Sequence, residues 1–126
     1  MSIWLLVGFG GFVGAILRYW LSSLIQSNFI TFPAGTLVVN FLGSFLLALI
    51  MYASEYRGVF NEETRICLTV GVLGTFTTMS TFSYESIKLL EQSEHMMFGF
   101  NLLGNVSLCL FAVYLGKFLV VGMGMK

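Results

Sequence analysis

GVLGTFTTMSTFSYE, residues 71–85, is rich in hydroxyl side chains for an otherwise apolar region of the chain. Six of them lie within the nine positions from Thr75 to Ser83, and no charged residue occurs from Cys67 to Tyr84. These eighteen positions nearly match the roughly 20 residues that cross a bilayer as a helix. Glycines and hydroxyl side chains here favour a helix broken at mid-membrane, where free backbone groups must be buried or line a polar cavity. The pattern predicts a transport path for a small polar species or ion.

Composition indicates that the whole chain is an integral membrane protein. Of its 126 residues, 57% are hydrophobic and 10% are charged, with a mean hydropathy of +0.90, whereas soluble domains carry about 25% charged residues. Short polar connectors separate four apolar segments that are long enough to span, at residues 3–25, 35–53, 66–87 and 96–121. We therefore predict an all-α membrane protein with four transmembrane helices, the third one broken, in a single domain over residues 1–126. The first segment is too long for a signal-peptide core, so we expect it to remain in the protein.

The sequence contains little that would support catalysis or transition-metal binding. Cys67 and Cys109 fall inside predicted spans, where small buried thiols are expected rather than a disulfide. His95 is the single histidine and lies in a connector, so the chain offers no Cys/His ligand set. We find no phosphate-binding motif and no pairing of a nucleophile with a base. The protein is therefore not expected to be an enzyme or to bind nucleic acid.

Lysine and arginine are divided almost evenly between the two predicted membrane faces. Four spans place both chain ends on one face, together with Arg57, Arg65, Lys117 and Lys126, against Lys88 and Arg18 on the other. An excess of Lys and Arg in short loops sets the orientation of a membrane protein, and four against two is a weak bias. Insertion in both orientations, and hence an antiparallel dimer, stays open.

A stripe of small residues followed by a cation runs along the first span. Gly10, Gly14, Arg18 and Ser22 recur every four residues and so share one helix face. One interpretation is a helix-packing seam, with the Arg18 guanidinium reaching toward the nearer membrane interface. The other is a charge that attracts anions at a vestibule, since an intramembrane charge costs at least about 2.5 kcal/mol and usually has a function.

Two further spans carry polar stripes. Thr36, Asn40 and Ser44 are spaced four apart in the second span, and Asn101, Asn105 and Cys109 are spaced likewise in the fourth. Such side chains most often bridge helices. Arranged around one axis with the hydroxyl-rich segment, they would instead supply donors and acceptors to a dehydrating ion.

Among the phenylalanines we single out Phe82, which stands beside the hydroxyl run. Met79, one helical turn earlier, is expected to share its face if the helix is regular there. An aromatic ring carries partial positive charge at its edge, so a ring presented edge-on can solvate an anion.

The chain resembles the Fluc, or CrcB, family of fluoride channels over essentially its whole length. Three motifs carry the resemblance: GGxxGxxxR from Gly10 to Arg18, GTLVVN from Gly35 to Asn40, and GxxGTFTTxSTFSxE from Gly71 to Glu85. Joined in this order and at this spacing, they are highly specific. The chain length, the four spans and the balanced charges agree with the family.

The resemblance implies an antiparallel homodimer in the cell membrane, with two narrow pores that passively release fluoride from the cytoplasm. It implies that Asn40 donates to fluoride and that Phe82 lines the pore. Pore or vestibule positions are further implied for Arg18, Met79, Ser80, Thr81, Asn105 and Cys109. The family usually has Phe where Met79 stands and Ser where Cys109 stands, so these two positions differ from the common pattern.

A structural sodium ion is also implied by the resemblance. Backbone carbonyls from both subunits would hold it at the centre of the dimer, and the motif places these carbonyls at Gly74 and Thr77. Oxygen ligands suit a hard cation.

Two other classes of small membrane protein are weighed against the channel. Small multidrug transporters that exchange protons need a carboxylate within the bundle, but the acidic residues here lie in connectors apart from Glu85, toward the end of the third span. Glu85 is expected either at a pore mouth or paired with Lys88. A membrane scaffold or assembly subunit would leave the hydroxyl run without a purpose.

Overall fold

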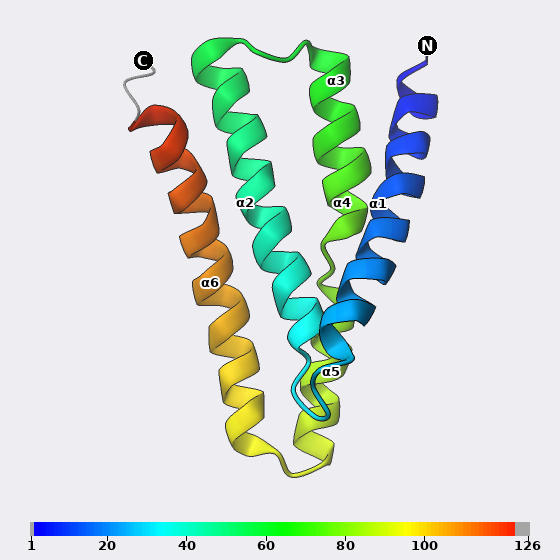
Figure 1. Ribbon diagram of the computed structural model, residues 1–126, viewed down its shortest axis with the longest axis vertical. Coiled ribbons are helices and arrows are strands. Elements are labelled where there is room, and N and C mark those ends of the chain that lie inside the picture. The colour runs from blue at the N-terminus through cyan, green and yellow to red at the C-terminus, as the bar shows by residue number, and fades with distance from the viewer. Residues whose placement is uncertain (1, 123–126) are drawn as a thin grey trace.

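The computed structural model describes residues 2–122 and is helical throughout its regular elements (Figure 1). Four helical stretches are long and apolar enough to cross a membrane. Three of them are continuous helices: α1 (Ile3–Gln26), α2 (Ala34–Arg57) and α6 (His95–Val121). The remaining stretch, Glu62–Glu91, is divided into α3 (Glu62–Ile66), the π-helix η1 (Cys67–Leu73), α4 (Gly74–Phe76) and α5 (Ser80–Glu91). The prediction of an all-helical protein with four spans is confirmed.

The helices run further into the polar connectors than the apolar segments predicted. The second was expected to end near residue 53 but reaches Arg57, where Gly58 ends it in the left-handed conformation (φ 62°). The third was expected from residue 66 to 87 but runs from Glu62 to Glu91. At its start the Asn61 side chain accepts a hydrogen bond from the Thr64 N–H (2.8 Å). Hydropathy marks the apolar part of a span, whereas capping residues set where the helix ends.

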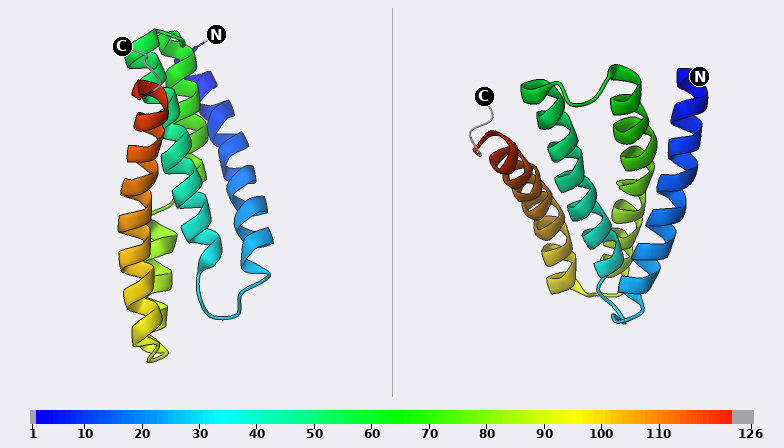
Figure 2. Two further views of the ribbon diagram at one scale, coloured as in Figure 1. Left: turned by 60° about the vertical axis from the view of Figure 1, so that its left-hand side comes forward. Right: turned by 45° about the horizontal axis from the view of Figure 1, so that its top comes forward.

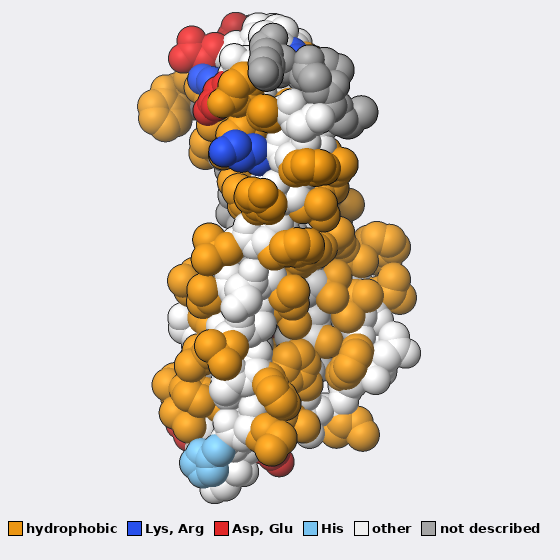
Figure 3. Space-filling view, turned by 90° about the vertical axis from the view of Figure 1, so that its left-hand side faces the viewer, with side chains coloured by type: hydrophobic (Ala, Val, Ile, Leu, Met, Phe, Trp, Pro, Cys, Tyr) orange, Lys and Arg blue, Asp and Glu red, His pale blue; other side chains and the backbone are white. Residues whose placement is uncertain are grey.

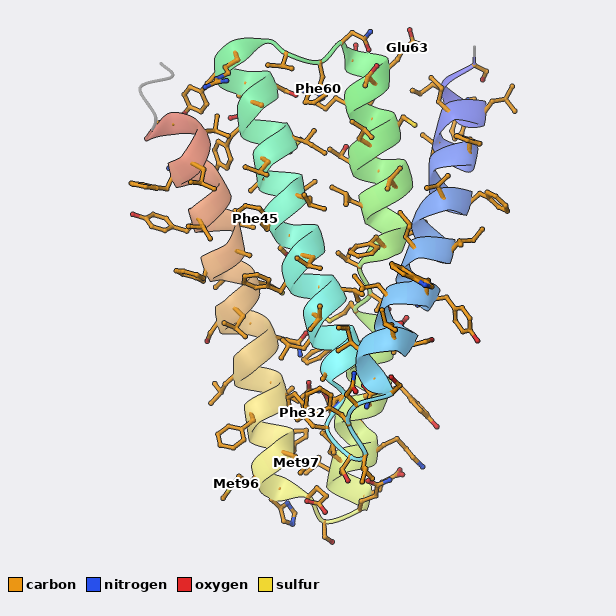
Figure 4. All side chains as sticks on the ribbon, viewed as in Figure 1. Phe32, Phe45, Phe60, Glu63, Met96 and Met97 are labelled. Atoms are coloured by element: carbon orange, nitrogen blue, oxygen red, sulfur yellow. The ribbon has the colours of Figure 1, made fainter. Side chains whose placement is uncertain are left out.

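The spans form an up-and-down bundle whose two ends are clearly distinct. The start of α1, the end of α6 and the α2–α3 connection lie at one end, and the α1–α2 loop and the α5–α6 turn lie at the other (Figures 1 and 2). Glu63 and Phe60 mark the first end in Figure 4, and Met96 and Met97 mark the second. Helix α2 packs along α6, and α1 packs on η1 and α4. Arg57 and Arg65 therefore lie at the same end as the start of α1 and the end of α6, as predicted, while Lys126 lies outside the described residues.

Small residues bring α1 into backbone contact with the third span. A Cβ atom added at Gly10 would lie 2.7 Å from the Cys67 carbonyl oxygen. One added at Gly14 would overlap the Val72 carbonyl and the Thr75 hydroxyl. Both glycines are buried, so this part of the first stripe is a packing seam.

The outer surface of the bundle is apolar. Large hydrophobic side chains such as Trp4 (82% exposed) and Tyr19 (76%) point outward. Figure 3 shows one face on which hydrophobic side chains predominate, with charged side chains gathered toward its two ends. A surface of this kind suits lipid, and we describe the chain as a multi-pass membrane protein.

Candidate functional site

The candidate site is centred on the residues between α4 and α5. At Thr77 the backbone is extended (φ −90°, ψ 160°), and helix resumes at Ser80. The Thr78 N–H, which a continuous helix would direct to the Gly74 carbonyl, donates instead to Asn40 Oδ1 (2.8 Å). Asn40 Nδ2 in turn donates to the Thr78 carbonyl (3.1 Å). The Asn40 carboxamide of α2 thus satisfies both backbone groups of Thr78.

A chain of polar side chains leads from Asn40 into the bundle. Asn40 Nδ2 also donates to Asn105 Oδ1 (3.1 Å), and Asn105 Nδ2 donates to Asn101 Oδ1 (3.0 Å). Asn101 Nδ2 then donates to Ser86 Oγ (2.9 Å). Asn101 and Asn105 are only 1% and 5% exposed. The polar stripes of the second and fourth spans therefore meet, and they bridge helices as such stripes most often do.

An open groove of about 500 Å³ runs along this centre between the second, third and fourth spans. Five of the residues predicted for the pore line it: Asn40, Met79, Phe82, Asn105 and Cys109. Gly74 and Thr77, predicted to bind sodium, line it as well. Apolar residues such as Leu47, Leu110 and Val113 form much of the rest. Met79 is 72% exposed on this face, and Met79 and Phe82 share the groove.

Ser80 and Thr81 lie at the start of α5, beside the groove but not among its lining residues. The Thr78 hydroxyl accepts a hydrogen bond from the Thr81 N–H (3.2 Å) and lies 3.1 Å from Thr81 Oγ1. Thr78 therefore caps α5 in the manner of an N-terminal Ser or Thr. Neither Thr78 nor the buried Ser86 was singled out from sequence. Thr78 belongs to the hydroxyl run, whose spacing gives no sign of which member caps the helix.

Arg18 lies away from the groove, on the opposite side of the third span. Its Nε donates to the Thr75 carbonyl (3.0 Å) at the end of α4. One nitrogen of the half-buried Arg18 guanidinium is therefore bonded to the backbone inside the bundle. A cation beside the last carbonyls of a helix also interacts favourably with the helix dipole.

A second, smaller groove lies at the end of the bundle that carries the α1–α2 loop. Its volume is about 300 Å³, and Thr31, Glu85, Lys88 and Gln92 are among its lining residues. Lys88 pairs with Glu91 (3.4 Å) rather than with Glu85. The predicted alternative of a Glu85–Lys88 pair is therefore wrong, and Glu85 Oε1 is buried without a hydrogen-bond partner among the residues that the structure describes.

Backbone oxygens near the centre of the third span are candidates for binding a cation. Among the residues that the structure describes, no group of three or more His, Cys, Asp and Glu side chains could hold a metal. The Gly74 carbonyl, however, loses its usual helical donor because the Thr78 N–H bonds to Asn40. Thr77, at the extended position, supplies a second carbonyl outside the helix. Two such oxygens fit the ligand preference of a hard cation.

Both cysteines are free, and each is half-buried where the sequence predicted a buried side chain. The Cys67 thiol lies 3.3 Å from the Leu6 carbonyl oxygen and packs α1 against η1. Cys109 lines the groove.

Comparison with known proteins identifies the family. The family model described as "CrcB-like protein, Camphor Resistance (CrcB)" matches residues 5–117. A Methanosarcina acetivorans protein named fluoride-specific ion channel FluC 1 is 61% identical over 113 residues, which cover 90% of this chain and 86% of that protein.

Two further relatives carry the same kind of name. A Methanosarcina barkeri protein, fluoride-specific ion channel FluC 3, is 54% identical over 94% of this chain and 89% of its own length. A Methanococcus vannielii protein, fluoride-specific ion channel FluC, is 44% identical over 93% of this chain and 94% of its own length. All three are named as ion channels and not as enzymes. The chain therefore belongs to the CrcB-like family.

Proposed function

We propose that this protein is a fluoride-selective channel of the cell membrane that passively releases fluoride from the cytoplasm. The observation that carries the proposal is the groove in which Asn40, Asn105 and Phe82 converge beside the non-helical residues 77–79. The names of the relatives, at up to 61% identity, support fluoride as the permeating ion. Residues 77–79 would lie at mid-membrane, where irregular backbone is tolerated only beside a polar cavity or inside protein.

The pore would form between two antiparallel copies of the chain. In a single copy the groove is open along its side, so Met79 and the apolar wall are exposed. Burying these apolar surfaces requires another apolar surface against them. A second copy supplies such a wall and would separate the polar residues from lipid. Arg57, Arg65 and Lys117 lie toward one end and Arg18 and Lys88 toward the other, so the charge bias that would impose a single orientation is weak.

Fluoride in the pore would exchange its water shell for donors on the protein. Asn40 Nδ2 is the central donor, and in the structure its two hydrogens point to the Thr78 carbonyl and to Asn105 Oδ1. Asn40 would serve fluoride by giving up the bond to Asn105, which retains its own bond to Asn101. Phe82 would present its ring edge to the anion. Met79, Asn105 and Cys109 would line the remaining path, with Ser80 and Thr81 as a polar track beside it. The Arg18 cation would favour anions near it.

Sodium would be bound at the dimer centre by the carbonyls of Gly74 and Thr77 from both subunits. The diverted Thr78 N–H supports this assignment, because it leaves the Gly74 oxygen available. Bound there, a sodium ion would neutralise the carbonyl dipoles and hold the two copies together. The ion would be structural and would take no part in moving fluoride.

Flux from liposomes tests the proposal. Purified protein reconstituted into liposomes loaded with potassium fluoride should release fluoride after valinomycin is added, without a proton gradient. Liposomes loaded with chloride should retain it under the same conditions. Comparable efflux of chloride, or fluoride efflux that depends on a proton gradient, would overturn the channel proposal and favour a transporter.

A further inference from the structure

Thr75 connects the third span to α1 through both its side chain and its backbone. Its hydroxyl lies 3.1 Å from the Gly11 carbonyl of α1, and its own carbonyl accepts from Arg18 Nε (3.0 Å). Gly11, Gly14 and Arg18 are spaced three and four apart and so lie on one face of α1. Gly14 lies between the two bonds, and a Cβ atom there would overlap the Thr75 hydroxyl.

The same hydroxyl also serves the π-helical turn that precedes it. Thr75 Oγ1 lies 2.9 Å from the Gly71 carbonyl and 3.1 Å from the Val72 carbonyl. Both carbonyls belong to η1 (Cys67–Leu73), where the backbone hydrogen bonds have the rarer π spacing. One hydroxyl proton is thus shared among three acceptors on two helices, at the place where the backbones of α1 and the third span are in contact.

Two residues further along, the chain leaves the helix at Thr77, and Thr78 is then bonded to Asn40 of α2. The non-helical residues are therefore held from both sides, by α1 through Thr75 and by α2 through Asn40. Thr75 does not line the groove, whereas Thr77 and Thr78 do. Its bonds can influence the groove only by setting where this backbone lies.

We propose that Thr75 is a positioning residue: by bonding α1 it fixes the end of α4, and thereby places the backbone of Thr77 and Thr78 in the groove. Thr75 carries no charge, so a change at this residue leaves the electrostatic field of the site nearly unaltered. Arg18 acts on the same carbonyl end but also brings a charge, so its replacement would mix the two effects. The inference rests on the proposed channel function for its flux measurement only.

The test compares Thr75→Val, which keeps the shape and loses the hydroxyl, with Thr75→Ser, which keeps the hydroxyl. Ser54→Ala is the matched control, because the Ser54 hydroxyl also bonds a carbonyl four residues earlier (Ile50, 2.8 Å) but remains within α2. Two quantities are measured at equal amounts of folded protein: fluoride efflux from liposomes, and hydrogen exchange of backbone amides in lipid nanodiscs. The Thr78 amide is the reporter of backbone position, since it donates to Asn40.

With Thr75→Val we expect about tenfold slower fluoride efflux and about tenfold faster exchange at the Thr78 amide, the loss expected for one hydrogen bond. Amides in the middle of α2 and α6 should keep their parent rates. Thr75→Ser and Ser54→Ala should stay within about twofold of the parent, since neither removes a bond between helices.

Three outcomes would overturn the inference. Thr75→Val could match the parent in both measurements, it could speed exchange equally in all spans, or Thr75→Ser could fail as badly as Thr75→Val. Faster exchange in all spans would mean that the substitution loosens the whole bundle. Failure of Thr75→Ser would mean that lost packing, and not the lost hydroxyl bond, causes the effect. If the parent itself released no fluoride, the channel proposal would fail, and the exchange rates alone would decide the role of Thr75.

Discussion

Replacing Asn40 by leucine should destabilise the fold as well as abolish flux. The change keeps the side chain at similar size but removes the amide that satisfies the Thr78 N–H, the Thr78 carbonyl and Asn105 Oδ1. A buried polar group left without a partner costs roughly 1–3 kcal/mol. Asn40 is half-buried, so we take a cost at the lower end of this range for each Thr78 and Asn105 group that loses its bond. Three such groups give a loss of about 3 kcal/mol in the free energy of unfolding.

The assay is thermal unfolding in detergent, followed by the fraction of protein that stays dimeric on size exclusion after heating. At about 3 °C per kcal/mol, the midpoint should fall by about 9 °C. Asn28→Leu is the matched control, since Asn28 is exposed and makes only a 3.4 Å bond within its own turn. A midpoint for Asn40→Leu within about 2 °C of the parent would refute the reasoning, because the amide bonds would then contribute nothing to the backbone between α4 and α5.

Three further predictions follow from the site and the packing. Phe82→Ile keeps an apolar side chain but loses the ring edge, so fluoride efflux should fall at least about tenfold, or about 1.4 kcal/mol; parent-like efflux at equal dimer yield would make Phe82 a packing residue. Gly14→Ala places a methyl group against the Val72 carbonyl, so folded yield should drop sharply, whereas Gly99→Ala meets open space and should express like the parent. Glu63→Cys, exposed in the first turn of α3 in a variant without native cysteines, should be labelled by an impermeant reagent from both membrane faces; labelling from one face only would contradict dual insertion.

Properties that depend on the order of residues along the chain could be predicted without coordinates. The apolar segments predicted the four spans, since a helix must present about 20 apolar residues to cross a bilayer. The motifs around Gly10, Asn40 and Phe82 predicted the family, which the relatives confirm. The spacing of Gly10 and Gly14 predicted that they share one helix face, because residues four apart stack on one side of a helix. Hydropathy predicted helices that were too short, because the second and third spans continue into polar residues before they end.

Which polar groups pair with one another depended on packing. Four-residue spacing placed Asn40 and Asn105 on helix faces, but the rotation and axial shift of each helix bring Asn40 to Thr78 and to Asn105 at once. The same holds for Arg18, whose bond to the Thr75 carbonyl spans 57 positions in sequence. Side-chain periodicity fixes a direction within one helix only. The relative placement of helices comes from close packing at glycines and from the need to satisfy every buried polar group, and both are properties of the assembled bundle.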